Sequence, residues 1–146
     1  MTASLDRAPD LETSNVLSVS DSEWFAAFDR LRHLDPIERA THRRIIETAQ
    51  GKRCFGLIEQ DGDPIACGLG VLVDDAVGLF DFFTVEPHRR NGHGAAIVGS
   101  ILRWAHHRSA RTGFLQVHSD NTPAHRLYEG FAFEVAYPYW YRVKPD

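Results

Sequence analysis

The sequence has little cysteine, no long apolar run and no excess of positive charge. Two cysteines among 146 residues, Cys54 and Cys67, are too few for the disulfide framework of a small secreted protein. Both lie in apolar surroundings, which favours two reduced, buried thiols over a disulfide or a nucleophile. No apolar stretch approaches the ~18 residues of a membrane span, and residues 1–13 carry acids without the apolar block of a secretory signal. We therefore expect a soluble cytoplasmic protein with no membrane contact.

The charge balance is weakly negative. The formal net charge of -4 gives no basic footprint, so nucleic-acid binding is not expected and any anion site must be local. Hydrophobic residues make up 43% and charged residues 25% of the chain, which is typical of a globular domain. Residues 1–12 show no periodicity, which predicts a disordered tail. Residues 13–146 suit one compact domain.

Periodicity and turn residues predict alternating strands and helices. Val16–Val19 is a short first strand, and two capping pairs then start two helices, Ser20 with Glu23 and Asp35 with Glu38. The next elements are strands over 54–60, 64–73 and 77–85, a helix over 94–107, a strand over 114–119, a helix over 123–130 and a strand over 133–143. The order predicts an α/β fold, a mixed sheet with helices on both faces.

Three segments add detail. Asp61-Gly62 is a hairpin turn signal. Residues 77–85 are almost entirely apolar, which predicts a central strand buried on both faces. Ile37, Thr41 and Ile45 share one face of the second helix.

The strongest chemical feature is the polar turn Arg89–Gly94 (RRNGHG), which joins an apolar strand to a helix. A helix N-terminus offers free backbone N–H groups to phosphate oxygens, and glycines let an anion approach. Arginines add charge-assisted hydrogen bonds. The lysine of a Walker loop is absent, and Ile97 occupies the third-glycine place of a dinucleotide fingerprint. A solvated basic turn that only caps the helix stays open as an alternative.

This turn resembles motif A of the GNAT superfamily of N-acetyltransferases, Gln/Arg-x-x-Gly-x-Gly/Ala. Arg89, Gly92 and Gly94 fill its defined places. Asn121–Ala124 and Leu127–Glu129 resemble the family's later motif, Asn-x-x-Ala-x-x-Leu-Tyr-Glu. The resemblance implies the family's splayed central sheet and acetyl-CoA as co-substrate, and its element order matches the order predicted above.

The resemblance also implies which residues bind the coenzyme. In the family, the strand before motif A leaves backbone groups free for the pantetheine arm and the acetyl carbonyl. Counting back from the motif places this role on Thr84, with Phe82 and Phe83 adjacent. Asn121 would lie near the coenzyme arm. The residues implied for the pyrophosphate are Arg89, Arg90, Asn91, Gly92, His93, Gly94 and Ala95.

The implied reaction is direct attack of an amine on the thioester, without a protein nucleophile. A backbone N–H at Thr84 or Val85 would stabilise the oxyanion. Tyr128 would protonate the leaving thiolate, although its spacing alone is typical of a core residue. Asp81 is the candidate general base because it interrupts an apolar strand. A structural aspartate bonded to the backbone or to an arginine is an equal alternative.

The sequence leaves the acceptor and the partners open. The acceptor is a small-molecule or protein amine, and the family is often dimeric, so a homodimer is also open. No histidine pair has the spacing of a metal site, so no metal is expected. Alternate tyrosines of the last predicted strand share one face: Tyr137, Tyr139 and Tyr141. This face is expected to pack against a helix, and an acceptor-pocket wall or a dimer edge stays open as an alternative. Thr84 stands where the family usually has valine, which keeps a catalytically silent coenzyme-binding module as the rival function.

Overall fold

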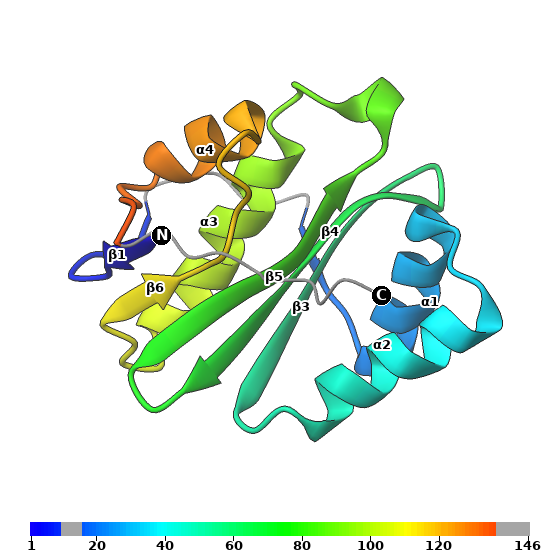
Figure 1. The fold of residues 1–146 in the computed structure, drawn as a ribbon, viewed down its shortest axis with the longest axis horizontal. Helices are drawn as coiled ribbons and strands as arrows, with labels where there is room; N and C mark the ends of the chain where they lie inside the picture. The colour runs from blue at the N-terminus through cyan, green and yellow to red at the C-terminus, as the bar shows by residue number, and fades with distance from the viewer. Residues whose placement is uncertain (10–15, 137–146) are drawn as a thin grey trace, which may run out of the picture.

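The computed structural model contains a six-stranded sheet with helices on both faces (Figure 1). It describes residues 1–9 and 16–136. The elements are β1 (Thr2–Ser4), β2 (Leu17–Ser18), α1 (Asp21–Arg32), α2 (Pro36–Thr48), β3 (Lys52–Gln60), β4 (Asp63–Val73), β5 (Ala76–Thr84), η1 (Glu86–His88), α3 (His93–His106), β6 (Thr112–Phe114) and α4 (Thr122–Glu129). The strand order is β1-β6-β5-β4-β3-β2, and only β5 and β6 pair in parallel. The predicted mixed α/β fold is confirmed.

The capping residues start the helices as predicted. The Ser20 side chain accepts from the Glu23 N–H at 3.3 Å. Asp35 and Glu38 form a reciprocal capping box, with hydrogen bonds of 2.8 and 3.1 Å. For α4, the Asn121 side chain accepts from the Ala124 N–H at 3.2 Å. Each bond satisfies an N–H group that the helix itself leaves without an acceptor.

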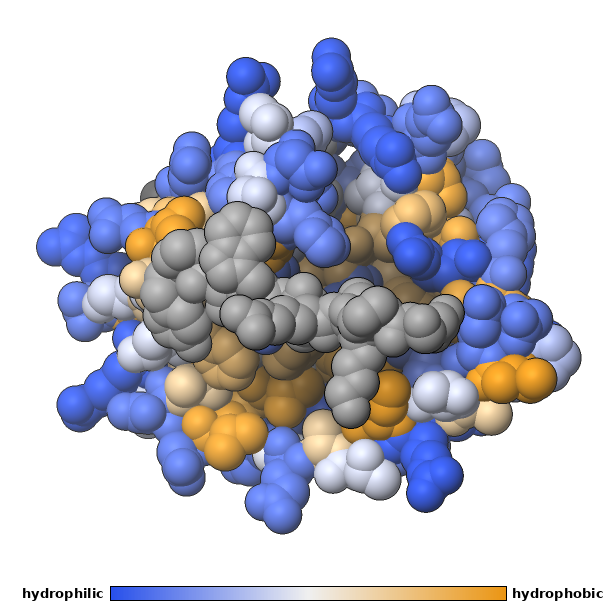
Figure 2. Space-filling model, in the orientation of Figure 1, coloured by the Kyte–Doolittle hydropathy of each residue, from blue (hydrophilic) through white to orange (hydrophobic). Residues whose placement is uncertain are grey.

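The sheet separates two hydrophobic cores. One lies against α3, where Ile97, Val98 and Ile101 are fully buried. The other lies against α1, where Trp24 is fully buried and its indole Nε1–H donates to the Gly56 carbonyl at 3.2 Å. On the face drawn in Figure 2, hydrophilic residues form the periphery and hydrophobic residues gather between them. No helix in the described part of the chain is long and apolar enough to span a membrane.

The hairpin and the interior strand agree with the sequence analysis. Asp61 and Gly62, between β3 and β4, have φ of 54° and 82°. A two-residue turn needs positive φ at both positions, which Asp-Gly supplies at low cost. β5 has β4 on one side and β6 on the other. Only its first half is buried, however, and residues 81–84 are half-exposed.

The N-terminal segment differs from the prediction. Thr2–Ser4 forms β1, which pairs antiparallel with β6, and Ala3 and Leu5 are buried. The segment is too short to show periodicity, and its backbone groups find their partners in distant parts of the chain, β6 on one side and Glu134 on the other. The predicted tail is therefore corrected for these residues, and residues 10–15 lie outside the described part of the chain.

One other element needs correction. The strand predicted over 114–119 is the shorter Thr112–Phe114, which contains Gly113. A Cβ on Gly113 would meet the Phe133 ring at 2.9 Å, so the glycine lets that ring pack against the strand. In α2, the face that Ile37 and Ile45 share is exposed, with 79% exposure of Ile37 and 63% of Ile45, and the buried residue of this helix is Ile46.

The last predicted strand is described only in part. Glu134 forms an isolated antiparallel bridge with Thr2. Tyr137, Tyr139 and Tyr141 lie outside the described residues, so their predicted shared face stays a prediction.

Both cysteines are free and buried, as predicted. Burial raises the pKa of Cys54 to about 11, and burial together with the nearby Asp81 charge raises the pKa of Cys67 to about 12. In the unfolded chain both thiols ionise near their ordinary pKa of 9.0. Above that pH the unfolded state holds fewer protons than the folded state, so the free energy of unfolding falls as pH rises.

We expect the urea midpoint of the wild type to fall between about pH 8.5 and about pH 10.5. Cys67→Ala should show a shallower decline because one thiol with a raised pKa is gone. The comparison uses slopes against pH, so the small packing cost of the substitution cancels. Parallel slopes for the two proteins would contradict this account of Cys67.

Candidate active site

The second half of β5 has no partner strand on its β6 side. β6 pairs with Ala76, Val77 and Gly78 and then ends at Phe114. Residues 79–84 remain paired with β4 alone among the described strands. The sheet therefore opens between β5 and β6, as the predicted splay requires. A splayed strand leaves every second pair of backbone groups free for a ligand.

Hydrogen-bond alternation identifies the free groups at the end of β5. The Val85 N–H donates to the Ile65 carbonyl at 2.9 Å, so it is not available as the oxyanion donor considered from the sequence. Successive residues of an antiparallel strand direct their N–H and C=O groups to opposite edges. The Thr84 N–H and C=O therefore face the open edge. The Thr84 carbonyl accepts from Arg89 Nε at 2.9 Å there, which agrees with this direction.

The predicted anion turn is the start of α3. Gly92 is the N-cap residue with φ 79°, and no side chain caps the helix. The first bond of the helix runs from the Ala96 N–H to the Gly92 carbonyl at 3.0 Å. The N–H groups of His93, Gly94 and Ala95 consequently have no acceptor among the described residues. Three such donors at the positive end of a helix form a site for phosphate oxygens.

The two glycines of the turn serve different purposes. A Cβ on Gly92 would meet nothing within 4 Å, so its role is the left-handed conformation. A Cβ on Gly94 would lie 3.3 Å from Leu127 Cδ2. The second glycine therefore lets α4 approach the first turn of α3.

The remaining residues of the turn lie at its surface. Arg90 and Asn91 are exposed, and Arg90 has φ 65°. The His93 ring lies 6.2 Å from the His88 ring. The backbone N–H of Arg89 donates to the Glu86 carbonyl, and its Nε–H donates to the Thr84 carbonyl at the end of β5. Its side chain is held at the strand end and not at the helix start.

Tyr128 lies beside the unpaired half of β5. It is 8% exposed, and its ring contacts the Phe82 ring edge-on, with centroids 6.3 Å apart. Phe133 contacts the other side of this cluster at 5.9 Å. Burial raises the pKa of Tyr128 to about 12, so its hydroxyl keeps its proton at neutral pH. The structure thus brings Phe82, Thr84 and Tyr128 to one region, while the Asn121 side-chain oxygen caps α4.

Asp81 lies at a bulge in the pairing of β4 with β5. Its side chain is on the face of the sheet opposite to Tyr128. The pairing of β4 with β5 shifts between Cys67 and Leu69, and Asp81 has φ 58°. Its Oδ2 lies 2.8 Å from His42 Nε2 on α2. The two alternatives considered from the sequence were a catalytic carboxylate and an aspartate bonded to the backbone or to an arginine. Its side-chain partner is instead a histidine.

The sequence analysis missed His42. Its ring stacks on Phe28 with centroids 4.2 Å apart and lies 6.0 Å from Trp24. Its Nδ1 is buried without a hydrogen-bond partner among the described residues. The pair with Asp81 spans 39 residues of sequence, so no local motif could reveal it. Because this nitrogen is buried, the half-exposed Asp81 carboxylate is the part of the pair that a substrate could reach, and the His42 ring holds it in position.

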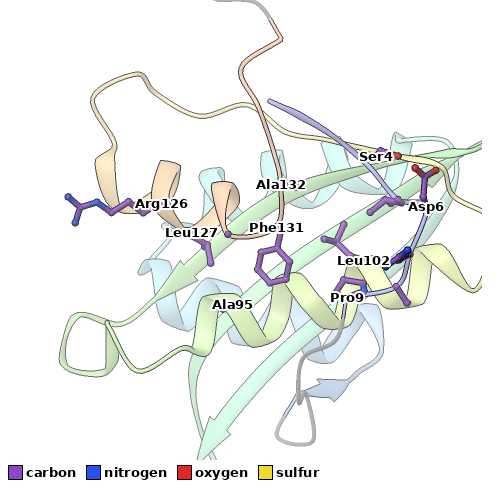
Figure 3. A pocket seen from close by; sticks show the side chains of 13 residues that line it. Ser4, Asp6, Pro9, Ala95, Leu102, Arg126, Leu127, Phe131 and Ala132 are labelled. Carbon is purple, nitrogen blue, oxygen red and sulfur yellow. The ribbon is translucent and has the colours of Figure 1, made fainter.

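A separate cavity of about 800 Å³ lies beside α3 and α4 (Figure 3). It is lined by residues 4–9, by Ala95 and Leu102 of α3, and by the end of α4 with the residues that follow it. The Phe131 ring lies at its centre in this view, and the Arg126 side chain points away. The cavity touches the anion turn only at Ala95. No group of three potential metal-ligating side chains occurs in the part of the chain that the structure describes.

Comparisons with known proteins place these features in a family. The model of the acetyltransferase (GNAT) family matches residues 16–133. A comparison with curated proteins found no significant match. Among solved structures, the fold is similar to AAC(6')-Iy in complex with the bisubstrate analogue CoA-S-monomethyl-acetylneamine. That pair has a TM-score of 0.69 and 14% identity, and the alignment covers 90% of this chain and 97% of the other.

Two further structures show the same fold. The ribosomal-protein-S18-alanine N-acetyltransferase from Escherichia coli aligns with a TM-score of 0.69 at 22% identity, over 84% of this chain and 78% of its own. The aminoglycoside 6'-N-acetyltransferase AAC(6')-IG from Acinetobacter haemolyticus aligns with a TM-score of 0.69 at 19% identity, over 90% and 99%. From the splayed strand, the uncapped helix start and the family match, the chain belongs to the acetyltransferase (GNAT) family.

Proposed function

We propose that this protein is an N-acetyltransferase that moves an acetyl group from acetyl-CoA to an amine by direct attack. The observation that carries the proposal is the junction of β5 and α3. There the open edge at Thr84 is followed, after one short turn, by the unbonded N–H groups of His93, Gly94 and Ala95. The first feature suits an extended amide-bearing arm, and the second suits a pyrophosphate.

The assignment of coenzyme contacts follows from this junction. The N–H groups at the start of α3 hold the pyrophosphate, with Arg90 and Asn91 at the rim of the turn. The open backbone groups of Phe82 and Thr84 bind the pantetheine arm. Arg89 contributes by its bond to the Thr84 carbonyl, which fixes the strand end. Asn121 contributes the start of α4 and thereby the position of Tyr128.

The proposal assigns one residue or pair of residues to each chemical step. The Thr84 N–H donates to the carbonyl oxygen as negative charge develops on it. The pair of Asp81 and His42 takes the proton that the attacking nitrogen loses as the C–N bond forms. Tyr128 donates its proton to sulfur as the C–S bond breaks, and solvent returns a proton to the phenolate. The two sides of β5 thus separate the proton acceptor from the proton donor.

The rival function is a module of the same fold that binds acetyl-CoA without turnover. The unusual segment Thr84–Pro87 is the observation that favours it. Thermal stabilisation by acetyl-CoA is expected from both functions. Thiol release with a panel of amines is expected only from the enzyme, so this assay separates them. The amines in the names of the structural neighbours include an aminoglycoside and a protein alanine, so both small-molecule and protein acceptors belong in the panel.

Tyr128→Phe should lower kcat by roughly tenfold to a thousandfold, because the proton donor is lost while the buried ring is kept. The dissociation constant of acetyl-CoA, measured by calorimetry, should change by less than about twofold. Since the pKa of Tyr128 is about 12, the wild type should show no loss of rate from its ionisation below about pH 11. Unchanged kcat in the variant would exclude the acid role.

Gly94→Val should weaken acetyl-CoA binding by about tenfold or more, because a branched side chain would cover the N–H groups at the start of α3. The same side chain would also press on Leu127 Cδ2, which lies 3.3 Å from the position of a Cβ. The double variant with Leu127→Ala removes this contact. We expect the double variant to bind as weakly as Gly94→Val. Restored binding would show that the loss came from helix packing and not from the anion site.

Asp81→Asn should lower kcat/KM, because an amide cannot accept the proton that the amine loses. Asparagine tolerates the left-handed conformation of residue 81, so the bulge should persist. His42→Gln should also lower kcat/KM, because the glutamine side chain no longer holds the carboxylate as the ring does. The control is Asp63→Asn, which removes a carboxylate that pairs with Arg30 at the surface. Full turnover of Asp81→Asn across the pH range would rule out Asp81 as part of the base.

A further inference from the structure

Two arginines converge on Phe83 at the end of β5. The Arg32 guanidinium, from the last turn of α1, lies 4.9 Å from the centroid of the Phe83 ring. The Arg89 guanidinium, from the turn after η1, lies 5.6 Å from the same centroid. Phe83 packs with the core on the α1 side of the sheet, the side that also carries Asp81 and His42. The ring thus holds two cations beside the candidate base.

Neither cation has a carboxylate partner among the described residues. The ion pairs there are Arg30 with Asp63 and His42 with Asp81. Arg89 donates its Nε–H to the Thr84 carbonyl, and its two terminal nitrogens have no hydrogen-bond partner among the described residues. The Arg32 guanidinium has no hydrogen-bond or ion-pair partner within the described part of the chain. Two like charges at one aromatic ring repel each other, and an anion between them removes that repulsion. Guanidinium groups are also well shaped to bind a carboxylate.

The negative side of the site lies on the same strand. Asp81 is two positions before Phe83 in β5, at the bulge between β4 and β5. Cys67 pairs with Phe83 in the sheet, and its thiol donates to the Asp81 carbonyl oxygen at 3.5 Å. Its ionisation is affected in opposite directions by the charges of Asp81 and Arg32. A carboxylate and two guanidinium groups therefore flank the same short stretch of β5.

The mixed charges beside β5 suit a small zwitterion. An α-amino acid carries its amine and its carboxylate on one carbon, so a single molecule offers a partner both to the Asp81 carboxylate and to a guanidinium group. The charges at β5 are of both signs, although the chain as a whole has a net charge of -4.

We propose that the acceptor is an amine with a carboxylate or similar anion a few bonds away, such as an amino acid. Its nitrogen lies at Asp81 and His42, and its anion lies between Arg32 and Arg89. This inference rests on the proposed acetyltransferase function and specifies the substrate class of the same site. Arg32 then determines specificity and takes no part in proton transfer.

The test compares matched acceptors that differ only in charge: glycine with glycinamide, and L-alanine with L-alaninamide. Loss of the carboxylate charge lowers the amine pKa and raises the reactive neutral fraction, so amine basicity alone would favour the amides. We expect kcat/KM by thiol release to favour the carboxylates by about tenfold or more. Arg32→Gln should bring this ratio close to one. The matched control Arg30→Gln, on the same helix but paired with Asp63, should keep it.

A second measurement needs no turnover. Calorimetry with N-acetylglycine and N-acetylglycinamide, in the presence of coenzyme A, should show carboxylate-dependent binding that Arg32→Gln abolishes. Turnover of amides at least equal to that of carboxylates would overturn the zwitterion proposal and leave the acetyltransferase function standing. Absence of thiol release with every amine, polyamines included, would overturn the acetyltransferase function. In that case calorimetry would still test whether an anion binds at Arg32 and Arg89. Equal binding of N-acetylglycine and N-acetylglycinamide, or no detectable binding of either, would overturn the proposed anion site.

Discussion

The structure depends on the incomplete pairing of β5. β4 pairs with both ends of β5 and is interrupted only by a bulge, whereas β6 pairs only with its first three residues. The cost of unpaired backbone groups is high in a protein interior and low where a ligand or solvent completes them. The bulge at Asp81 adds a second irregularity on the same strand, and it re-aims side chains next to the opening. Within the described part of the chain, the candidate site lies where the pairing of β5 with β6 stops.

Both hydrophobic cores are needed to hold that opening. Ile97 and Ile101 fix α3 against the sheet, and this places the uncapped N–H groups just beyond the strand end. On the other side, Trp24 and Phe28 pack under His42 and so fix its ring beside Asp81. Packing density in such cores leaves little freedom to shift a helix by even an ångström. The positions of donor and acceptor groups are therefore set by residues that touch neither ligand.

β1 and α2, at the periphery of the fold, are held by different kinds of contact. β1 forms because β6 offers an unpaired edge, and Ala3 and Leu5 then bury their side chains. The same segment lines the cavity beside α3 and α4, which reaches the anion turn at Ala95. α2, in contrast, leaves Ile37 and Ile45 in solvent and buries Ile46. Its attachment depends more on the Asp35 capping box and on the bond between His42 and Asp81 than on an apolar stripe.

The sequence by itself determined the elements whose signals are local. Capping pairs marked two helix starts, Asp61-Gly62 marked the hairpin, and the turn at residues 89–94 marked the start of α3, because each depends on residues within one turn of chain. Tertiary structure decided what depends on distant partners. The bond of His42 to Asp81, the return of Arg89 to Thr84 and the pairing of β1 with β6 join segments that only the folded sheet brings together. The same holds for the choice of Thr84 over Val85, since the register with β4 fixes which N–H groups are already bonded.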